Sequence, residues 1–368
     1  MSLWLDGVSR SYPPLDRDVT TDVAVVGAGI AGIATAYFLA SAGAKVVVLE
    51  ARGVAEAASG RNAGFLLAGV AENFVAASRR YGERNALRIW RFTRRTQALA
   101  RSLVAEHGID CALRWNGSDQ IAGDDEEWRE IEESARRLSS EGVAVDLDPA
   151  SRCATYADDG ELHPVRWVRG LAAAAATNGV RIHESTRVDA VAPGEARTAA
   201  GVVRAGAIVL CINAYTAHLT TSRVRPVRGQ ILATAPAPPA FARPAYANRG
   251  YQYWRQTSDG RVLAGGWRDT AVDAEVGEEE RTTDVIQKHL EAFLREHNVN
   301  APVTHRWAGT MGFSHDALPY IGRIAQGVFV CGGFTGHGMA FGPASAELVA
   351  AIVRGATHPD ADLFDPDR

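Results

Sequence analysis

The sequence predicts a mixed α/β protein with two domains, one a discontinuous domain with a parallel sheet and the other an α+β domain with an antiparallel sheet. The first observation is a strand–turn–helix–strand unit near the N-terminus, with further buried-strand patterns in the middle and near the end of the chain. The second is that segments alternating like antiparallel strands lie between these patterns. We therefore expect the second domain to be inserted into the first in two pieces.

Residues 22 to 50 contain the most specific motif. Val23–Val26 resembles a buried strand, Ile30–Ala42 has helical periodicity, and Val46–Leu49 resembles a second strand. Between the first strand and the helix stand glycines in the spacing G-x-G-x-x-G: Gly27, Gly29 and Gly32. The first allows a tight turn, the second leaves room for a pyrophosphate, and the third lets the helix pack close to the sheet.

This unit predicts a Rossmann-like dinucleotide-binding domain. The helix N-terminus, with Ile30 and Ala31, presents N–H groups and a partial positive charge to phosphates. Glu50, followed by Ala51 and Arg52, can accept hydrogen bonds from ribose hydroxyls. The alternative is a glycine-rich turn in an ordinary α/β protein. An acid at position 50 suits NAD as well as FAD.

The remaining elements follow from periodicity and turn residues. Helices are expected at 83–107, 124–141, about 164–178, 278–296 and about 343–354, and strands at 180–182, 187–191, 202–210, 224–235, 251–257, 261–266 and 327–331. The predicted nucleotide-binding domain comprises 1–82, 145–220 and 300–368. The predicted substrate domain comprises 83–144 and 221–299.

Composition narrows the function classes. The chain has 368 residues, 46% of them hydrophobic, and its net charge of −4 argues against a general nucleic-acid binder. The four cysteines are scattered and predict neither a metal site nor a disulfide framework. No apolar run reaches transmembrane length and the N-terminus does not resemble a signal peptide, so we expect no membrane association and a cytoplasmic location.

Eight motifs, one of them the glycine-rich turn described above, carry a resemblance that spans nearly the whole chain. They are YPPL at 12–15, GAGIAG at 27–32, ASGRNAG at 58–64, LHPVRWVRGLA at 162–172, CINAY at 211–215, DGRVLAGG at 259–266, WAGTMGFSHDALPYIG at 307–322 and GGFTGHGM at 332–339. In this order the chain resembles the FAD-dependent amine and amino-acid oxidases, the superfamily of glycine, sarcosine and D-amino-acid oxidases. The resemblance is closest to gamma-glutamylputrescine oxidase-like members.

The resemblance implies FAD as the cofactor and assigns residues to it. Beyond the first motif, these residues are Ser59, Gly60, Arg61, Asn62, Ala63, Gly64, Val188, Asn213, Gly333, Phe334, Thr335, Gly336, Gly338 and Met339. The segment 332–339 is expected to pass the pyrimidine edge of the flavin, where backbone N–H groups stabilise developing negative charge. A flexible turn before a helix is the alternative reading of this segment.

The implied reaction is oxidation of a C–N bond to an imine by hydride transfer to flavin N5, with reoxidation by dioxygen to hydrogen peroxide. If the amine binds unprotonated, no enzyme base is required. A dehydrogenase or tailoring enzyme that uses another electron acceptor is the main alternative, and a non-catalytic FAD-binding protein is a third hypothesis. The sequence identifies neither the substrate nor the oligomeric state.

Three departures from the family pattern bear on the expected substrate, on the attachment of FAD and on the reaction with oxygen. Met311 stands where glycine and D-amino-acid oxidases use an arginine for the substrate carboxylate, and Ala340 stands where sarcosine oxidases carry a lysine. No cysteine lies in the segment that attaches FAD in sarcosine oxidases, so we expect non-covalent FAD. Leu263 stands near the position of their oxygen-activating lysine, and neither Lys45 nor Lys288 can replace it.

Candidate catalytic and substrate residues come from the antiparallel segments and the glycine-rich segment. Tyr251, Tyr253 and Arg255 alternate along one strand and would share a face, where aromatic walls suit an amine chain and an arginine suits a distant carboxylate. Packing of these aromatics in the sheet core is the alternative. We also expect Arg61 and Trp267 near the substrate, Arg268 or His337 as the cation near the reacting atoms, and His337 close to the flavin or the substrate.

Overall fold

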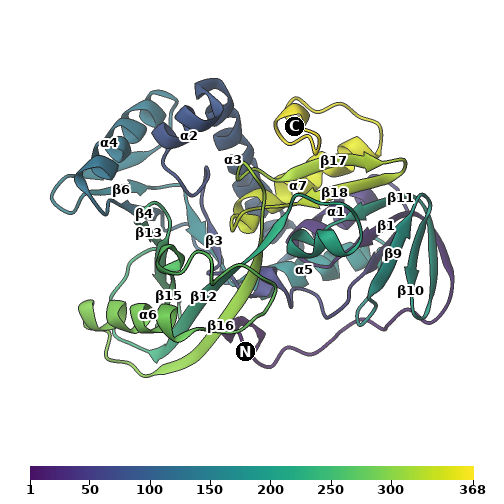
Figure 1. Ribbon diagram of the computed structural model, residues 1–368, viewed down its shortest axis with the longest axis horizontal. Coiled ribbons are helices and arrows are strands. Elements are labelled where there is room, and N and C mark those ends of the chain that lie inside the picture. The colour runs from purple at the N-terminus through teal and green to yellow at the C-terminus, as the bar shows by residue number, and fades with distance from the viewer.

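The computed structural model describes all 368 residues, which form two lobes, each built around one large sheet (Figure 1). In the first sheet, five parallel strands run in the order β18-β11-β1-β2-β8, and β17 adds an antiparallel edge. Their bounds are β1 Val19–Val26, β2 Val46–Leu49, β8 Arg181–His183, β11 Gly201–Leu210, β17 Tyr320–Ala325 and β18 Val328–Gly332. The predicted discontinuous parallel-sheet domain is confirmed.

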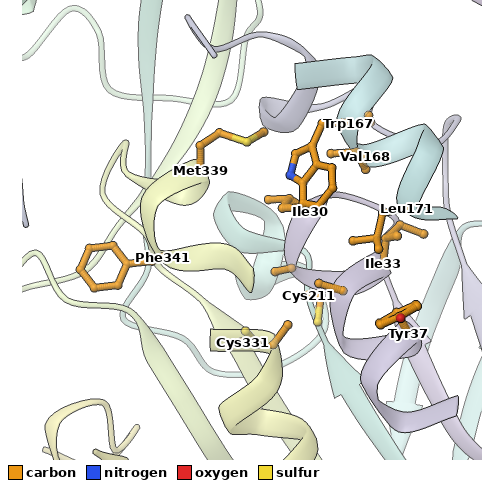
Figure 2. Packing of buried hydrophobic residues seen from close by; sticks show 14 of the residues in the cluster. Ile30, Ile33, Tyr37, Trp167, Val168, Leu171, Cys211, Cys331, Met339 and Phe341 are labelled. Carbon is orange, nitrogen blue, oxygen red and sulfur yellow. The ribbon is translucent and has the colours of Figure 1, made fainter. Parts of the chain in front are cut away.

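Three helices cover one face of this sheet: α1 Ile30–Ser41, α5 Pro164–Thr177 and α7 Gly338–Val353. Figure 2 shows Trp167, Val168 and Leu171 of α5 pointing toward Ile30 and Ile33 of α1. The other face is covered by the antiparallel strands β9 Val188–Ala192 and β10 Glu195–Thr198; β10 pairs with both β9 and β11. Both faces of the parallel strands are therefore buried, as their continuous apolar sequence predicts.

The second sheet has the order β16-β12-β15-β14-β13-β4-β6-β5, and all its pairs are antiparallel except β13 with β4. The bounds are β4 Ser118–Ile121, β5 Val145–Asp148, β6 Cys153–Tyr156, β12 Arg225–Pro236, β13 Ala245–Ala247, β14 Gln252–Gln256, β15 Arg261–Gly266 and β16 Val303–Phe313. Helix α6, Asp284–Glu296, packs its apolar side, including Leu290 and Phe293, against β12 and β15.

The remaining elements lie outside the two large sheets and outside the helices α1, α5, α6 and α7. They are α2 Phe74–Tyr81, α3 Glu83–His107, α4 Asp125–Ser140, the small paired strands β3 Phe65–Leu66 and β7 Gly160–Glu161, and the short 3₁₀ helices η1 Leu3–Leu5, η2 Ala58–Gly60, η3 Asn213–His218, η4 Arg268–Thr270 and η5 Ala361–Leu363. Helix α3 packs against α7 of the first lobe as well as against α2. No helix combines the length and the apolar character that crossing a bilayer requires.

Strand pairing corrects the predicted domain boundaries. Strands β5 and β6, within 145–156, and β16 pair inside the second sheet, although they follow the boundaries placed at 145 and 300. Their partners β4 and β12 are distant in the chain or separated by a helix, so local periodicity carries no sign of the pairing.

Two predicted helix starts are also wrong. Helix α7 begins at Gly338 rather than near Pro343, which lies inside it; the next amide, Ala344 N, donates to Thr96 Oγ1 at 3.2 Å. Helix α6 begins at Asp284 rather than Glu278. In the intervening loop, Glu278 pairs with His218 and Glu280 pairs with Arg52 and Arg61 of the first lobe.

Candidate functional site

A cavity of about 1330 Å³ lies between the two sheets. It begins at the carboxyl ends of β1, β2 and β11, bordered by Val26, Leu49 and Cys211, and extends to a wall of aromatic side chains on the second sheet. Ligands of parallel α/β sheets bind at the carboxyl ends of the strands. The volume exceeds the roughly 300–1,000 Å³ of pockets for drug-sized ligands, so it can hold a dinucleotide together with a substrate.

The G-x-G-x-x-G turn opens this cavity at the start of α1. Gly27 has φ of 102°, and a Cβ there would lie 2.7 Å from the carbonyl oxygen of Cys211. A Cβ on Gly29 would meet only the Oγ of Ser59, at 2.9 Å. That oxygen accepts a hydrogen bond from Ile30 N at 3.0 Å. The first turn of α1 therefore faces the cavity with N–H groups that have no partner inside the helix.

Glu50 lies at the end of β2 and borders the same end of the cavity. Its two carboxylate oxygens accept hydrogen bonds of 2.7 Å from Ala28 N and Arg52 N. Burial raises the pKa of Glu50, and the two backbone hydrogen bonds oppose that rise. Val188 at the start of β9 borders the cavity nearby. Glu50 and Val188, which the sequence predicts to contact the ribose and the adenine, therefore both lie at this end of the cavity.

The N-terminal residues hold the segment 58–64 against the cavity. Ser2 Oγ donates to the carbonyl of Gly60 at 2.8 Å, and Trp4 Nε1 donates to the carbonyl of Asn62 at 2.7 Å. The Asn62 side chain itself holds this turn, because its Oδ1 accepts a hydrogen bond from Gly64 N at 2.7 Å. We did not predict this tether from the sequence, where residues 1–20 resemble an irregular lead-in.

Two arginines of the cavity wall share one carboxylate from the other lobe. Glu280, in the loop before α6, lies 3.0 Å from Nη2 of Arg61 and 2.8 Å from Nη1 of Arg52. Arg61 also donates to the carbonyl of Ala308 at 3.2 Å, and its side chain is 15% exposed. Sequence reasoning missed Glu280, because the run of acids at 278–280 matched the solvated face of a helix.

The glycine-rich segment before α7 reaches the middle of the cavity. Asn213 Oδ1 accepts hydrogen bonds from Gly333 N and Phe334 N at 2.8 and 3.3 Å, so Asn213 supports the segment as well as bordering the cavity. Thr335 is left-handed with φ of 49°, and its N–H donates to the carbonyl of Gly312 at 2.7 Å. Five further predicted residues border the cavity here: Phe334, Gly336, His337, Gly338 and Met339.

One ring nitrogen of His337 is hydrogen-bonded and the other is not. Its Nδ1 lies 3.3 Å from the carbonyl oxygen of Thr335, which gives this nitrogen the proton in the neutral ring. Its Nε2 is buried and has no hydrogen-bond partner in the protein. Burial lowers the pKa of His337 below its usual value, with the bond to Thr335 opposing the shift. The ring is therefore neutral near pH 7 and presents an acceptor.

The far wall consists of Tyr246, Tyr251, Tyr253, Phe313 and Arg268. The Arg268 guanidinium carbon lies 5.2 Å from the ring centre of Tyr251 and 4.9 Å from that of Phe313. Tyr246 was not predicted, since its short strand β13 follows a proline-rich loop. The predicted Tyr251 and Tyr253 do share the cavity side of the sheet, while Trp254 packs against α6 on the opposite side.

Two predicted substrate residues do not border the cavity. The Arg255 side chain is 3% exposed; its Nε lies 2.8 Å from Glu161 Oε2, and its Nη1 donates to the carbonyl of Ala63 at 2.9 Å. Because Arg255 forms a buried ion pair with Glu161, its guanidinium is not available to bind a carboxylate of the substrate. Trp267 is 9% exposed and packs on Phe293 of α6, with ring centres 5.5 Å apart.

Three predicted cofactor glycines also lie behind the cavity wall. A Cβ would lie 1.9 Å from the Gly27 carbonyl oxygen at Gly32, 2.1 Å from the Ala55 carbonyl oxygen at Gly60, and 3.1 Å from the Tyr320 ring at Gly333. These positions permit close packing rather than contact with a ligand. The other predicted cofactor residues border the cavity: Gly27, Gly29, Ile30, Ala31, Glu50, Ala51, Arg52, Ser59, Arg61, Asn62, Ala63, Gly64, Val188 and Asn213.

The donor set fits FAD and offers no site for a metal. Among the described residues, no group of three or more His, Cys, Asp and Glu side chains could hold a metal ion. By contrast, the cradle at Gly29, the helix start beside it and the carboxylate of Glu50 match the phosphates and ribose of a dinucleotide. All four cysteines are free, and Cys331 is fully buried behind the wall.

Comparison with known proteins agrees with this geometry. The family model described as FAD dependent oxidoreductase (DAO) matches residues 22–352. Gamma-glutamylputrescine oxidoreductase of Escherichia coli (strain K12) is 28% identical over 388 residues, covering 97% of this chain and 89% of the relative. Glycine oxidase of Geobacillus kaustophilus (strain HTA426) is 27% identical over 363 residues, covering 90% of this chain and 92% of the relative.

Solved structures share the fold. The crystal structure of glycine oxidase from Geobacillus kaustophilus superimposes with a TM-score of 0.81 at 23% identity, covering 95% of this chain and 99% of that one. The crystal structure of L-proline dehydrogenase from P. horikoshii superimposes with a TM-score of 0.79 at 21% identity, covering 95% of this chain and 97% of that one. At these identities the likeness concerns the two-domain fold and not the substrate.

Proposed function

The chain belongs to the family of FAD dependent oxidoreductases, and from this premise we propose that it oxidises a carbon–nitrogen bond of an amine or amino-acid-like substrate to an imine. The observation that supports this most is the continuous cavity, which joins a dinucleotide cradle on the first sheet to a tyrosine-lined wall on the second. The names of two relatives, gamma-glutamylputrescine oxidoreductase and glycine oxidase, refer to compounds with an amino group.

In this proposal specific residues hold the cofactor. Gly27, Gly29 and the start of α1 receive the pyrophosphate, Glu50 the ribose, and the start of α7 the flavin ring. Held there, FAD would supply a hydride acceptor at N5 and a route for the electrons to dioxygen, which would be reduced to hydrogen peroxide. Free N–H groups in the first turn of α7 supply a partial positive charge beside the ring.

The protein residues orient the amine rather than deprotonate it. Carboxylates at the substrate end are already paired, Glu72 with Arg80 at 2.8 Å and Asp316 with Arg368 at 2.8 Å. His337 is neutral, so its free Nε2 can accept a hydrogen bond from the substrate amine. The tyrosine wall surrounds the carbon chain and excludes water. The amine therefore has to arrive in its unprotonated form for the hydride to leave.

The electron acceptor has a second candidate. Neither Lys45 nor Lys288 borders the cavity, so no lysine is available to assist the reaction with dioxygen. A dehydrogenase that passes electrons to another acceptor is therefore the alternative. In the oxidase proposal, the predicted residue next to the reacting atoms is His337, whose ring is neutral near pH 7 and so is not the cation expected there. We also propose non-covalent FAD and a cytoplasmic location.

A panel of amines and amino acids tests the proposal. Purified protein loaded with FAD is mixed anaerobically with each compound while flavin absorbance is recorded, and the same mixtures are then exposed to air. We expect bleaching by at least one amine, and recovery with stoichiometric peroxide on aeration. Bleaching that air does not reverse within minutes would favour the dehydrogenase, whereas no bleaching by any compound would contradict the proposed reaction. Release of free FAD on denaturation tests the non-covalent link.

A further inference from the structure

Arg268 differs from every other cation on the cavity wall. Arg52 and Arg61 pair with Glu280, Arg80 pairs with Glu72, and Arg249 lies 3.0 Å from Asp124. The two remaining arginines of the wall, Arg187 and Arg225, are exposed to solvent. The guanidinium of Arg268 is half-buried and has neither a carboxylate nor a hydrogen-bond partner in the protein.

The backbone and two rings fix Arg268 in place. Trp267, at the end of β15, has φ of 56°, and its N–H donates to the carbonyl of Tyr251 at 2.7 Å. This turn directs the next side chain between the rings of Tyr251 and Phe313. Stacking on two rings holds the planar guanidinium but uses none of its five N–H donors. A fixed fork of free donors is the arrangement that binds a carboxylate in a bidentate manner.

Two tyrosine rings separate Arg268 from His337. The ring centre of Tyr246 lies 6.0 Å from that of His337 and 6.0 Å from that of Tyr253. Tyr253 in turn lies close enough to Arg268 for the positive charge to lower its pKa, although burial dominates and raises that pKa. A ligand that touches both His337 and Arg268 has to pass along this wall, so its two polar ends are several atoms apart.

We propose that Arg268 binds a carboxylate of the substrate, and that the enzyme oxidises amines carrying a carboxylate several atoms from the reacting nitrogen. This rests on the proposed function and adds the substrate class to it. The substrate end of the wall offers a free cation and no free carboxylate, so it favours an anionic group over a second ammonium.

Matched ligands test this assignment. The pair 5-aminopentanoate and 5-aminopentanamide has the same chain and the same amine but differs in the charge of the far end. In the FAD-loaded protein we expect anaerobic flavin reduction to show at least about tenfold tighter binding of the carboxylate, from a charge-assisted hydrogen bond. Pentanoate, which cannot be oxidised, should bind as well; calorimetry measures that binding without any turnover.

Substitutions at Arg268 separate charge from geometry. Arg268→Gln should weaken binding of 5-aminopentanoate and pentanoate about tenfold to a hundredfold, leave 5-aminopentanamide within about threefold, and change the limiting reduction rate little. Arg268→Lys should restore part of the affinity. The control Arg249→Gln removes a paired cation of the same wall and should change pentanoate binding less than about threefold.

Other outcomes distinguish the failures. Equal weakening by Arg249→Gln would mean that the general positive field attracts the ligand, which overturns the assignment. Equal binding of the acid and the amide to the unaltered protein overturns it as well, while flavin reduction by either still supports the proposed function. If no amine reduces the flavin, the proposed function fails, and pentanoate binding to the two arginine variants still decides whether Arg268 binds a carboxylate.

Discussion

The carboxylate of Glu280 lies 3.0 Å from the guanidinium of Arg61, and the two side chains are 18% and 15% exposed. Arg61 belongs to the cavity wall of the first lobe, whereas Glu280 comes from the loop between β15 and α6 of the second. Glu280 also reaches Arg52 at 2.8 Å but does not border the cavity itself. It therefore holds two cofactor-facing arginines from behind and joins the lobes across the nucleotide end.

We expect Glu280→Gln to loosen this junction. The substitution keeps the shape of the side chain but leaves the sheltered Arg61 and the partly exposed Arg52 without their shared counter-charge, which costs about 1–3 kcal/mol. The melting temperature should fall by a few degrees, and limited proteolysis should cut the loop at 277–283 faster than in the unaltered protein. FAD retention after gel filtration should fall as well. Glu279→Gln, at a 70% exposed side chain of the same loop, is the matched control and should change none of these.

Gly29 should be required for FAD and not for folding. Its Cβ would meet only the mobile Oγ of Ser59, at 2.9 Å, so Gly29→Ala should fold but block close approach of the pyrophosphate. We expect a melting temperature within a few degrees of the unaltered apoprotein and at least about tenfold weaker FAD binding in fluorescence titration. The double variant Gly29→Ala/Ser59→Ala removes the internal clash; recovery of FAD binding in it would show that Ser59 crowding was responsible instead.

Asp159 should make the stability of the fold depend on pH. It is buried between the lobes, accepting hydrogen bonds from Gln97 Nε2 and Ser118 Oγ at 2.7 Å, and burial raises its pKa from 3.8 to about 6. The native state then binds more protons than the unfolded state between these values, so the unfolding free energy falls as pH rises from about 4 to 6. Asp159→Asn should remove this dependence. The unfolding free energy of the variant minus that of the unaltered protein should therefore rise by at most about 3 kcal/mol as pH goes from about 4 to 6. A constant difference in denaturant titrations at pH 4, 5, 6 and 7 would contradict the raised pKa.

Local sequence signals predicted the parallel-sheet domain well, because its units bury continuous apolar strands and carry glycines with a steric purpose. The bounds of β2, α3 and β15 agree with the expected 46–49, 83–107 and 261–266. The second sheet was predicted less completely, since β4, β5, β6, β13 and β16 are short, half-exposed or paired with distant partners. Register between distant strands depends on tertiary packing, which a local pattern does not contain.

In the candidate site, too, local sequence predicts some residues, and tertiary packing decides the others. Motif residues such as Gly29 and Glu50 border the cavity because a fixed backbone geometry requires them. Arg255 illustrates the limit: alternation placed it correctly on the face shared with Tyr253, but its partner Glu161 lies on β7, far away in the sequence. Whether an arginine is free or paired is decided by such distant partners.

Arg255 should matter for stability and not for substrate binding. Its side chain and that of Glu161 are 3% and 0% exposed, and Glu161 also pairs with Arg114. Arg255→Met leaves Glu161 buried with less counter-charge, which should lower the unfolding free energy by about 3 kcal/mol. The double variant Arg255→Met/Glu161→Gln should recover part of this loss. The affinity of the variant for a reducing amine should stay within about threefold; a larger change with normal stability would return Arg255 to the substrate site.

His337 should orient the amine without titrating during the reaction. Burial keeps its pKa below the usual 6.5, so the ring stays neutral as pH rises from 6.5, and the acid limb of kcat/KM should follow the deprotonation of the substrate amine instead. His337→Leu loses the acceptor at Nε2 and should reduce the rate of anaerobic flavin reduction about tenfold to a hundredfold. Its acid limb should keep the same midpoint, and this midpoint should move when amines of different pKa are compared. Loss of the limb in His337→Leu would instead identify the ring as a base, because the limb disappears only if the replaced group was the one whose titration caused it.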